Sequence, residues 1–487
     1  MNDERNALKA KFAESNRFTN FGNILMSMHV KGFRCHTDTF IEFSSPITAF
    51  CGLNGTGKST LLQLAAAAYN SPDPGNIYPF HISDFLVVGT LDPNPFTNNA
   101  TIGYKFWKED RSLKSANLSR IFTPKRKRWG GYKQRPKRRV FFAGISLYLP
   151  KIERHDFIHR NANRLSVSNT QEVSERIKSW TCNVLGQSYE NIFSNTVSYS
   201  KQKGNVISVQ KSGTKYSEPH MGYGEGRTLY LISMLESLPE RSLILLEEPE
   251  TSLHPSAQYE FGRYLVNVSK ERCHQILLTT HSEFILQALP SESRIYVHKT
   301  DNGTKTIIGL TTLQAKSFMS DGNVKALHIL VEDKCAQSVL RQMLRRFDPD
   351  FLRSVGIYPA GDKDTIAKTV RSLKATNLPV AAVRDGDKGD APLENIFKLP
   401  GTLPPEKELF ADKAVKEYIQ LEYHVNLDDF SVSLVDINHH DWLKRLAERV
   451  NQEEDTITSE VAQVYARHLP EGIALSLIKP LKEASRR

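Results

Sequence analysis

The sequence lacks any apolar run long enough to cross a membrane. Nothing in its 487 residues approaches about 18 uninterrupted apolar positions, the minimum for a spanning helix. The first residues, MNDERNALKAKFAES, are charged and polar, unlike a secretory signal. We therefore expect a cytoplasmic protein with no membrane partner.

Cysteine is scarce, and low-complexity tracts are almost absent. The five cysteines are scattered, and no pair has the spacing of zinc ligands, so we expect reduced thiols. The composition, 39% hydrophobic and 24% charged, is typical of a globular chain. A chain of this length predicts two or three domains.

Acidic residues are missing from one stretch, KRKRWGGYKQRPKRR, residues 125–139. It accounts for nine of the ten formal net positive charges, so the remainder of the chain has a charge of only +1. A solvated loop is one interpretation. The other is a nucleic-acid arm in which Trp129 and Tyr132 stack on bases and the basic side chains contact phosphates: Lys125, Arg126, Lys127, Arg128, Lys133, Arg135, Lys137, Arg138 and Arg139.

Two blocks of alternating strand and helix patterns predict an α/β protein with helix-covered parallel sheets. The first block ends near SDGNV, residues 320–324, where turn-forming residues separate the two patterns. We therefore predict a helical lead-in over 1–23, a first α/β domain over 24–320 with a basic insertion at 124–139, a smaller α/β domain over 321–425, and a helical C-terminal region over 426–487.

The segment GLNGTGKST, residues 52–60, fits the phosphate-loop pattern G-x-x-x-x-G-K-[ST] between a strand and a helix. Its glycines allow backbone N–H groups to surround phosphates at a helix N-terminus. Lys58 is expected to reach the β- and γ-phosphates of ATP, and Ser59 to bind Mg²⁺. The expected nucleotide-binding residues are Asn54, Gly55, Gly57, Lys58, Ser59 and Thr60.

A second apolar strand, in SLILLEEPETSLHP, ends at Glu247 and Glu248. At the carboxyl end of a parallel strand, one of the two would hold Mg²⁺, directly or through water, and the other would polarise the attacking water. A further strand, in ILLTTHSE, ends at His281, which is either catalytic or a satisfied buried histidine.

In the second block, one strand ends at Glu332 and another, 53 residues on, ends at Asp385 and Asp387. Because parallel strands end at one edge of a sheet, the three carboxylates are expected to converge. Oxygen donors of this kind suit Mg²⁺ or Mn²⁺, which can activate water against a phosphodiester. Lys363 and Lys388 could neutralise phosphate charge.

The order of phosphate loop, ILLEEPETSLHP and LLTTH resembles the ABC-type ATPases of the SMC and OLD (overcoming lysogenization defect) group. The resemblance implies that Glu248 is the catalytic base, His281 the switch histidine, and 252–254 the D-loop. MGYGEGR, residues 221–227, is the signature candidate, which implies that Gly224 and Glu225 meet nucleotide held by a second subunit. Gly222 stands where the family has serine. A homodimer or higher oligomer is implied.

The pattern of strand–Glu followed by strand–Asp-x-Asp resembles the Toprim domain, and an ABC-type ATPase followed by Toprim is the OLD architecture. The family typically has a second glutamate four residues after the first, where this chain has Ala336. A second metal would then need another ligand, for which the sequence leaves Asp333, Asp362, Asp364, Glu406 and Glu408 open.

Three functions remain open at this point. The resemblance implies an ATPase that gates a metal-dependent nuclease in prokaryotic defence against phage, with a possible partner protein or RNA. Alternatively, the chain is an ATPase sensor and scaffold whose altered Toprim domain docks a separate effector. A DNA-repair ATPase of the RecF type would explain the first block only.

Overall fold

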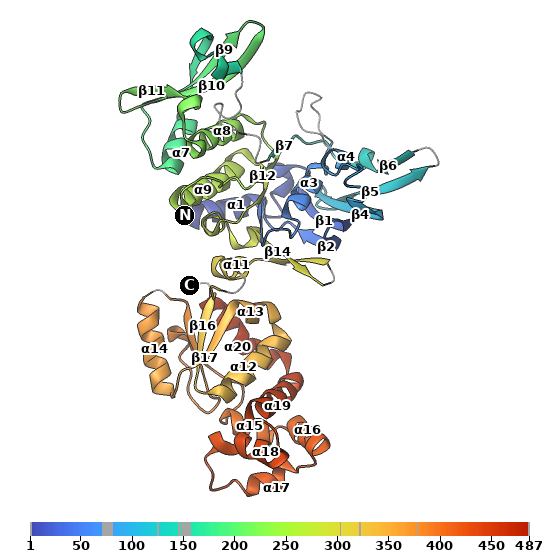
Figure 1. The fold of residues 1–487 in the computed structure, drawn as a ribbon, viewed down its shortest axis with the longest axis vertical. Helices are drawn as coiled ribbons and strands as arrows, with labels where there is room; N and C mark the ends of the chain where they lie inside the picture. The colour runs from blue at the N-terminus through green and yellow to red at the C-terminus, as the bar shows by residue number, and fades with distance from the viewer. Residues whose placement is uncertain are drawn as a thin grey trace. The chain divides into compact units, whose positions relative to one another are not determined.

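The computed structural model describes residues 2–70, 81–123, 126–144, 148, 157–301, 303–320, 323–376 and 378–485. The chain forms two compact units, residues 1–310 and 311–487 (Figure 1). The division lies ten residues before the boundary expected from the turn-rich segment at 320–324. Among the described residues, no helix combines the length and apolar character needed to cross a membrane.

The first unit is organised around a six-stranded sheet of order β15-β14-β3-β13-β12-β7. All neighbouring strands are parallel except β14 and β15, which confirms the predicted parallel sheet. Every residue of β3 and β13 is buried, as expected for strands covered on both faces. The strands are β3 (Ile47–Cys51), β7 (Val140–Ala143), β12 (Leu243–Glu247), β13 (Gln275–Thr279), β14 (Arg294–Thr300) and β15 (Gly303–Ile308).

Two antiparallel sheets complete this unit. The sheet of order β2-β1-β4-β5-β6 shares a hydrophobic core with the parallel sheet, whereas the sheet β11-β10-β9-β8 has its own smaller clusters. Their strands are β1 (Leu25–Phe33), β2 (His36–Glu42), β4 (Phe96–Trp107), β5 (Leu113–Thr123), β6 (Arg126–Gly130), β8 (Ser166–Glu172), β9 (Asn191–Tyr199), β10 (Gln202–Lys211) and β11 (Thr214–Ser217).

The helices of the first unit supply the remaining layer. Helix α3 follows the phosphate loop directly, and α1 packs on the long helix α9, where Asn267 donates a hydrogen bond to Glu4 (2.8 Å). The helices are α1 (Asn2–Phe12), α2 (Arg17–Phe21), α3 (Lys58–Ala66), α4 (Ile82–Phe85), α6 (Phe157–Arg160), α7 (Glu175–Leu185), α8 (Tyr223–Ser237), α9 (Pro255–Arg272) and α10 (Glu283–Ala288).

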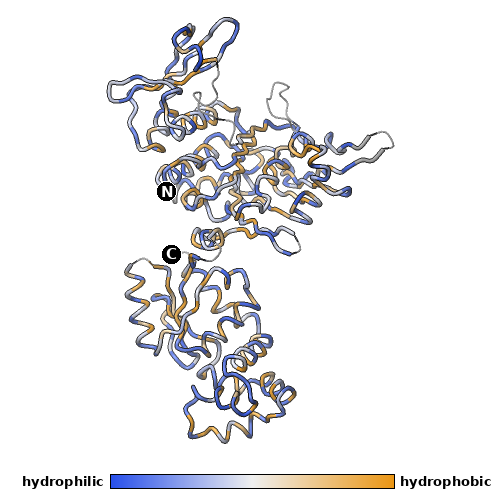
Figure 2. The backbone as a smooth tube through the Cα atoms, viewed as in Figure 1, coloured by the Kyte–Doolittle hydropathy of each residue, from blue (hydrophilic) through white to orange (hydrophobic). Residues whose placement is uncertain are grey.

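The second unit contains a parallel four-stranded sheet of order β17-β16-β18-β19. The strands are β16 (Leu327–Val331), β17 (Val355–Pro359), β18 (Val380–Arg384) and β19 (Ile396–Lys398). Apolar residues are concentrated along these strands, as the orange segments in Figure 2 show. The predicted alternation of strand and helix in this part of the chain is therefore confirmed.

The C-terminal helices share one hydrophobic core with this sheet. Residues from Leu327 on β16 to Ala484 on the last helix belong to the same buried cluster. The helices of the unit are α11 (Thr312–Met319), α12 (Lys334–Phe347), α13 (Pro349–Ser354), α14 (Lys363–Ala375), α15 (Pro405–Ala411), α16 (Lys413–Tyr423), α17 (Leu427–Val432), α18 (Trp442–Val450), α19 (Glu454–His468) and α20 (Glu471–Ala484). The helical region beyond residue 426 is therefore built into the second unit.

Candidate nucleotide and metal sites

The phosphate loop joins the buried strand β3 to helix α3. Gly55 and Gly57 have φ values of 75° and 90°, in the left-handed region that glycine adopts without strain. Asn54, Gly55 and Ser59 are exposed on the loop, whereas Thr60 is buried and its hydroxyl accepts a hydrogen bond from Arg34 (3.4 Å). Loop backbone and the α3 N-terminus therefore lie where the sequence predicts phosphate binding.

Lys58 folds back over its own loop. Its ammonium group donates hydrogen bonds to the carbonyl oxygens of Gly52 and Leu53, both at 2.9 Å. Burial lowers the pKa of Lys58, opposed chiefly by the charge of Glu248. The lysine is thus held at the loop, within electrostatic range of the carboxylate strand.

A buried histidine supports the loop from below. His36 is fully buried, and its Nε2 lies 3.1 Å from the carbonyl oxygen of Gly57. A Cβ added at Gly57 would lie 2.3 Å from that nitrogen and 2.5 Å from the sulfur of Cys35. Gly57 is therefore required both for its backbone conformation and for the space that His36 and Cys35 occupy.

Glu248 and His281 meet at the ends of the neighbouring parallel strands β12 and β13. His281 Nε2 lies 3.6 Å from Glu248 Oε1, and burial lowers the pKa of His281. Glu248 has a φ of 41°, and its backbone N–H donates to the carbonyl oxygen of Thr279 (3.1 Å). A positive φ at a non-glycine residue stores strain that the surrounding structure must hold, which is common at functional sites.

Glu250 is a member of this cluster that the sequence pattern did not reveal. Its carboxylate is 8% exposed and accepts hydrogen bonds from the hydroxyl of Thr280 (2.6 Å) and the backbone N–H of His281 (2.9 Å). Burial raises its pKa. Glu250 thus fixes the backbone that carries His281. The signal available in the sequence was a third glutamate in EEPE, directly after the buried strand.

The signature candidate forms the start of helix α8. Gly222 precedes the helix as its N-cap and offers no side-chain hydrogen bond, while a Cβ at Gly224 would lie 2.4 Å from the carbonyl oxygen of Ser252. Glu225 accepts hydrogen bonds from Tyr189 (2.7 Å) and Tyr216 (2.8 Å), so its carboxylate ties the helix to the sheet β11-β10-β9-β8.

Arg227 links the signature candidate to the carboxylate strand within one chain. The side chain is buried and donates to the carbonyl oxygen of Glu247 at 3.2 Å. The sequence placed Arg227 in the motif but gave no sign of this contact.

In the second unit, the predicted convergence of strand ends occurs. Strands β16 and β18 are parallel neighbours, and the backbone N–H of Asp385 donates to Glu332 Oε1 at 3.2 Å. Asp387 is ion-paired with Lys388, with Oδ2 and Nζ 2.6 Å apart. Lys363 is exposed at the start of α14.

Two of the three carboxylates, those of Glu332 and Asp385, belong to residues that meet at this edge, and they offer oxygen donors of the kind that a hard divalent cation takes. Asp385 is 2% exposed, and its Oδ1 is buried without a hydrogen-bond partner among the described residues. Burial, followed by the charge of Glu332, raises its pKa to about 8, and burial raises the pKa of Glu332. Since buried carboxylates are costly without compensation, an oxygen-coordinated cation suits this arrangement.

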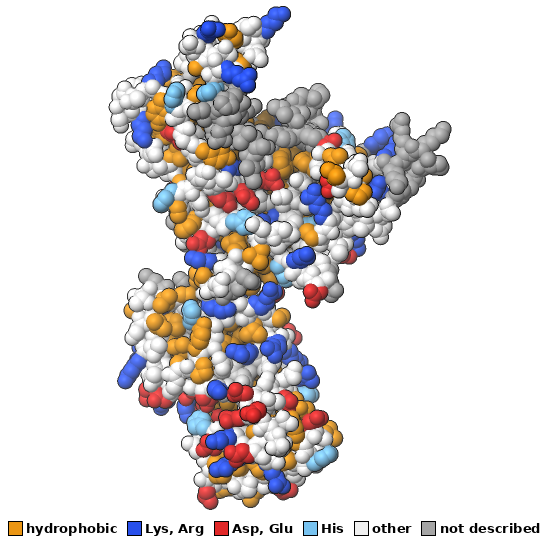
Figure 3. Space-filling model, viewed as in Figure 1, with side chains coloured by type: hydrophobic (Ala, Val, Ile, Leu, Met, Phe, Trp, Pro, Cys, Tyr) orange, Lys and Arg blue, Asp and Glu red, His pale blue; other side chains and the backbone are white. Residues whose placement is uncertain are grey.

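The five candidates for an additional ligand fall into two groups. Asp362 caps α14 through the backbone N–H groups of Asp364 and Thr365, Asp364 is exposed, and Glu408 packs against Gly401. Asp333, Asp362 and Glu406 line one cavity of about 450 Å³ together with Glu332, and the carboxylates of Asp333 and Glu406 both lie beside the imidazole of His440. Figure 3 shows acidic side chains gathered on the visible face of this unit.

The basic segment is only partly available to a nucleic acid. Lys125 and the side chains of Arg126 and Lys127 lie outside the described residues, and the exposed basic residues are Arg128, Lys133, Lys137 and Arg139. Arg135 and Arg138 are each 7% exposed. Arg135 donates to the carbonyl oxygen of Ala67 (2.9 Å) and Arg138 to the hydroxyl of Tyr69 (3.4 Å). The prediction that these two arginines contact phosphates is therefore corrected: they hold the fold.

The expected stacking residues also belong to the fold. Trp129 stacks on Phe33, with ring centroids 5.4 Å apart, and meets Phe96 edge-on. The hydroxyl of Tyr132 accepts a hydrogen bond from the backbone N–H of Ile82 (3.1 Å). These aromatic rings anchor β6 and the following turn, so base stacking by them is not supported.

These features define a P-loop ATPase domain: a phosphate loop, two glutamates at the end of β12, and a histidine just beyond the neighbouring strand β13. Comparison with protein families supports this class, since residues 24–65 and 108–286 match the AAA ATPase domain.

Two curated proteins are similar to parts of the chain. Protein ea59 of Escherichia phage lambda is 26% identical over 267 residues, which cover 51% of this chain and 47% of that protein. Old nuclease of Escherichia phage P2 is 41% identical over 69 residues, covering 14% of this chain and 12% of that protein. The chain thus spans less than half the length of either relative.

Solved structures of SMC heads align with this chain only at low TM-scores. The SMC head domain from Thermotoga maritima aligns with a TM-score of 0.34 and 18% identity, covering 58% of this chain and 98% of that one. An SMC head bound to the C-winged helix domain of ScpA aligns at 0.37 and 17%, covering 58% and 96%. Likeness at these TM-scores supports no conclusion about this chain.

Proposed function

We propose that this protein is an ATP-gated, metal-dependent nuclease of the OLD type. The first unit would bind and hydrolyse ATP, and the second would cleave a nucleic acid. The similarity of a 69-residue stretch to a protein named Old nuclease supports this assignment, as does the order of motifs along the chain. A setting in defence against phage rests on the family resemblance alone.

The ATPase half would work through residues that already lie close together. Lys58 would exchange its two loop carbonyls for the phosphates of ATP, and Mg²⁺, held by Ser59 and Glu247, would neutralise charge on the phosphates. Glu248 would orient the attacking water, and His281, 3.6 Å from it, would sense the γ-phosphate. Gly224 and Glu225 would act on the nucleotide of a second subunit, which makes a homodimer part of the proposal.

The observation that supports nuclease chemistry most directly is the pairing of the half-buried Glu332 with the buried Asp385 at the ends of β16 and β18. Glu332 and Asp385 are joined by a hydrogen bond, and one oxygen of Asp385 has no partner in the described structure. A divalent cation bound there would polarise a phosphodiester and lower the pKa of a bound water. Asp387 would complete the oxygen donors, and Lys388 would approach a phosphate of the substrate.

A scaffold function is the second candidate, and two positions favour it. Ala336, where the family has glutamate, is fully buried in the hydrophobic core of the second unit. Gly222 supplies no hydroxyl to a γ-phosphate. In this alternative, the ATPase senses a signal and the second unit docks a separate effector.

Two variants, one in each site and each assayed for both ATP hydrolysis and nucleic-acid cleavage, separate the two activities. Lys58→Ala should abolish ATP hydrolysis, because the phosphates lose their principal cation. Asp385→Ala should abolish cleavage of DNA or RNA in Mg²⁺ or Mn²⁺ while ATP hydrolysis continues. Unchanged hydrolysis in Lys58→Ala would refute the phosphate-loop assignment, and the absence of cleavage by the wild type under every nucleotide condition would favour the scaffold.

A further inference from the structure

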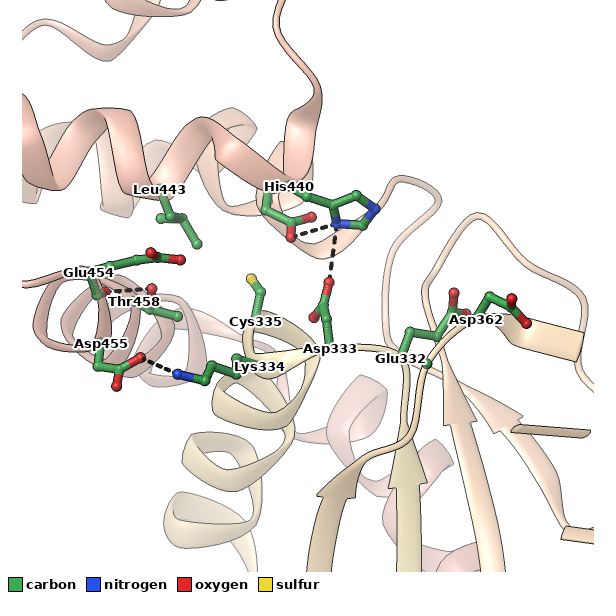
Figure 4. Close-up of a pocket in the computed structure, with 12 residues that line it drawn as sticks. Glu332, Asp333, Lys334, Cys335, Asp362, His440, Leu443, Glu454, Asp455 and Thr458 are labelled. Carbon is green, nitrogen blue, oxygen red and sulfur yellow. Dashed lines mark hydrogen bonds and ion pairs between the residues drawn. The ribbon is translucent and has the colours of Figure 1, made fainter. Parts of the chain in front are cut away.

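Three residues that are distant in sequence converge beside the carboxylates of the second unit. Asp333 follows Glu332 at the end of β16, Glu406 lies in the first turn of α15, and His440 lies in the short 3₁₀ helix His439–Asp441. Figure 4 shows His440 directly beside Asp333, joined to it by a dashed line, among the residues that line the cavity. The three side chains belong to three separate elements, so the tertiary fold brings this cluster together.

The donor atoms have the spacing of ligands around one ion. His440 Nδ1 lies 3.2 Å from Asp333 Oδ2 and 3.4 Å from Glu406 Oε1. The corresponding edges of a tetrahedron or octahedron around a cation with bonds of about 2.1 Å are roughly 3.0–3.4 Å. His439 offers a further donor on the side of Glu406, since the ligand atoms of Glu406, His439 and His440 all lie within 4.8 Å of one another.

Burial supplies an independent indication of a ligand. Glu406 is 2% exposed, and its Oε2 is buried with no hydrogen-bond partner among the described residues. An unpaired buried carboxylate oxygen costs free energy that a bound cation would remove. His440, by contrast, is half-exposed, so an ion could enter from the cavity.

The local backbone fixes two of the donors. Asp333 caps α12, and its Oδ1 accepts the backbone N–H of Ala336 at 2.8 Å, which leaves Oδ2 directed at His440. Asn438 accepts the backbone N–H of His440 at 3.2 Å and so holds the turn that presents the imidazole. Both donors are therefore positioned before any ion binds.

We propose that Asp333, Glu406 and His440, with His439, form a second divalent-cation site that prefers a transition metal such as Mn²⁺ to Mg²⁺. An imidazole nitrogen among carboxylates suits Mn²⁺ or Zn²⁺, whereas Mg²⁺ favours oxygen donors alone. This site rests on the proposed function, because it would provide the second ion beside Glu332 and Asp385. Asp333, Glu406 and His440 would then replace the glutamate ligand that the family has at the position of Ala336.

The test uses full-length protein freed of metal, without nucleotide, with Mn²⁺ as the probe. Electron paramagnetic resonance of free Mn²⁺ gives the stoichiometry, and the echo modulation of bound Mn²⁺ detects imidazole nitrogen. We expect about two bound ions per chain, one of them with nitrogen modulation, as in two-metal centres. His440→Ala and Glu406→Gln should each remove the nitrogen-coordinated ion, and Asp387→Asn only the other.

Matched controls come from the same unit. Asp455→Asn removes an acid that lines the cavity but is paired with Lys334, and His468→Ala removes an exposed imidazole. Neither should change the nitrogen signal. Absence of nitrogen modulation in the wild type, or its persistence when His439→Ala and His440→Ala are combined, would overturn the site. Nitrogen-coordinated Mn²⁺ in a protein that cleaves nothing would instead remove the proposed nuclease and leave the site standing.

Discussion

Glu250 offers a sharp test of how the ATPase site is held together. The carboxylate accepts two short hydrogen bonds, from the hydroxyl of Thr280 and the backbone N–H of His281. Both donors lie just beyond β13, and the second belongs to the histidine that faces Glu248. We propose that Glu250 acts as a positioning residue for His281.

The expected magnitudes follow from those two bonds. A hydrogen bond to a charged group contributes about 1.5–3 kcal/mol, so loss of both in Glu250→Ala should lower the free energy of unfolding by about 3–6 kcal/mol. Glu250→Gln keeps one acceptor oxygen in place and should cost only about 1 kcal/mol. Displacement of His281 by about 1 Å should reduce kcat for ATP hydrolysis about 100-fold in the alanine variant.

Urea unfolding and steady-state ATP hydrolysis, measured on wild type and both variants, provide the assay. Because the alanine variant can lose activity through unfolding, hydrolysis is compared without urea, at a temperature where all three proteins are folded. The glutamine variant provides the decisive comparison, since it should recover most of the kcat lost in the alanine variant. Equal kcat in wild type and Glu250→Ala would refute the positioning role.

Three further predictions concern other parts of the first unit. His274 is fully buried, its Nδ1 accepts the backbone N–H of Ser242, and burial lowers its pKa to about 3. Below about pH 6.5 the unfolded chain therefore binds a proton at His274 that the folded protein does not bind. The free energy of unfolding should consequently fall by about 2 kcal/mol between pH 7 and pH 5. In urea unfolding of His274→Gln, the decrease over the same pH range should be smaller by about 2 kcal/mol. Gly57→Ala should weaken binding of a fluorescent ATP analogue at least ~10-fold, because of the φ of 90° and the close approach of His36, whereas Gly472→Ala, with open space around it, should bind normally. Replacing the exposed Arg128, Lys133, Lys137 and Arg139 by glutamine should lower the slope of log affinity against log salt for a DNA oligonucleotide, by up to about 0.7–0.9 for each phosphate that the segment no longer neutralises. An unchanged slope would leave this segment without a nucleic-acid role.

The sequence predicted those elements in which hydrophobic pattern and motif agree. The parallel strands β3, β12 and β13 are short, largely apolar runs followed by loop or carboxylate signals, which distinguish them from helices. The rule that parallel strands end at one edge predicted that Glu332 and Asp385 lie at the same edge, whereas the direct pairing of β16 with β18, which brings them into contact, is visible in the structure alone.

Other elements had no such pattern. All seven residues of β8 are exposed, so no alternation of apolar and polar positions marks it as a strand. In the basic segment, the charged composition gave no sign that two side chains are buried. Arg135 and Arg138 stack on Tyr132 and Tyr69, respectively, and also donate hydrogen bonds. Local charge density predicts a solvated surface, and only the tertiary contacts show which side chains cross into the core.

The candidate second metal site is a feature that the sequence did not predict. The sequence leaves Glu406 as one of five open ligand candidates, and it gives no sign of His440, which lies 107 residues from Asp333. Only the packing of the C-terminal helices into the core of the second unit brings these side chains together. A site assembled from three elements leaves no fixed spacing in the sequence.

The most direct test of the proposed function is cleavage of a labelled nucleic acid by wild type, Asp385→Ala and Asp390→Ala in Mn²⁺ and ATP. Asp390 is an exposed acid five residues beyond the buried one, so it controls for charge in the same loop. We expect cleavage by wild type and Asp390→Ala, none by Asp385→Ala, and equal ATP hydrolysis in all three. Cleavage that persists in Asp385→Ala would contradict the proposed nuclease site.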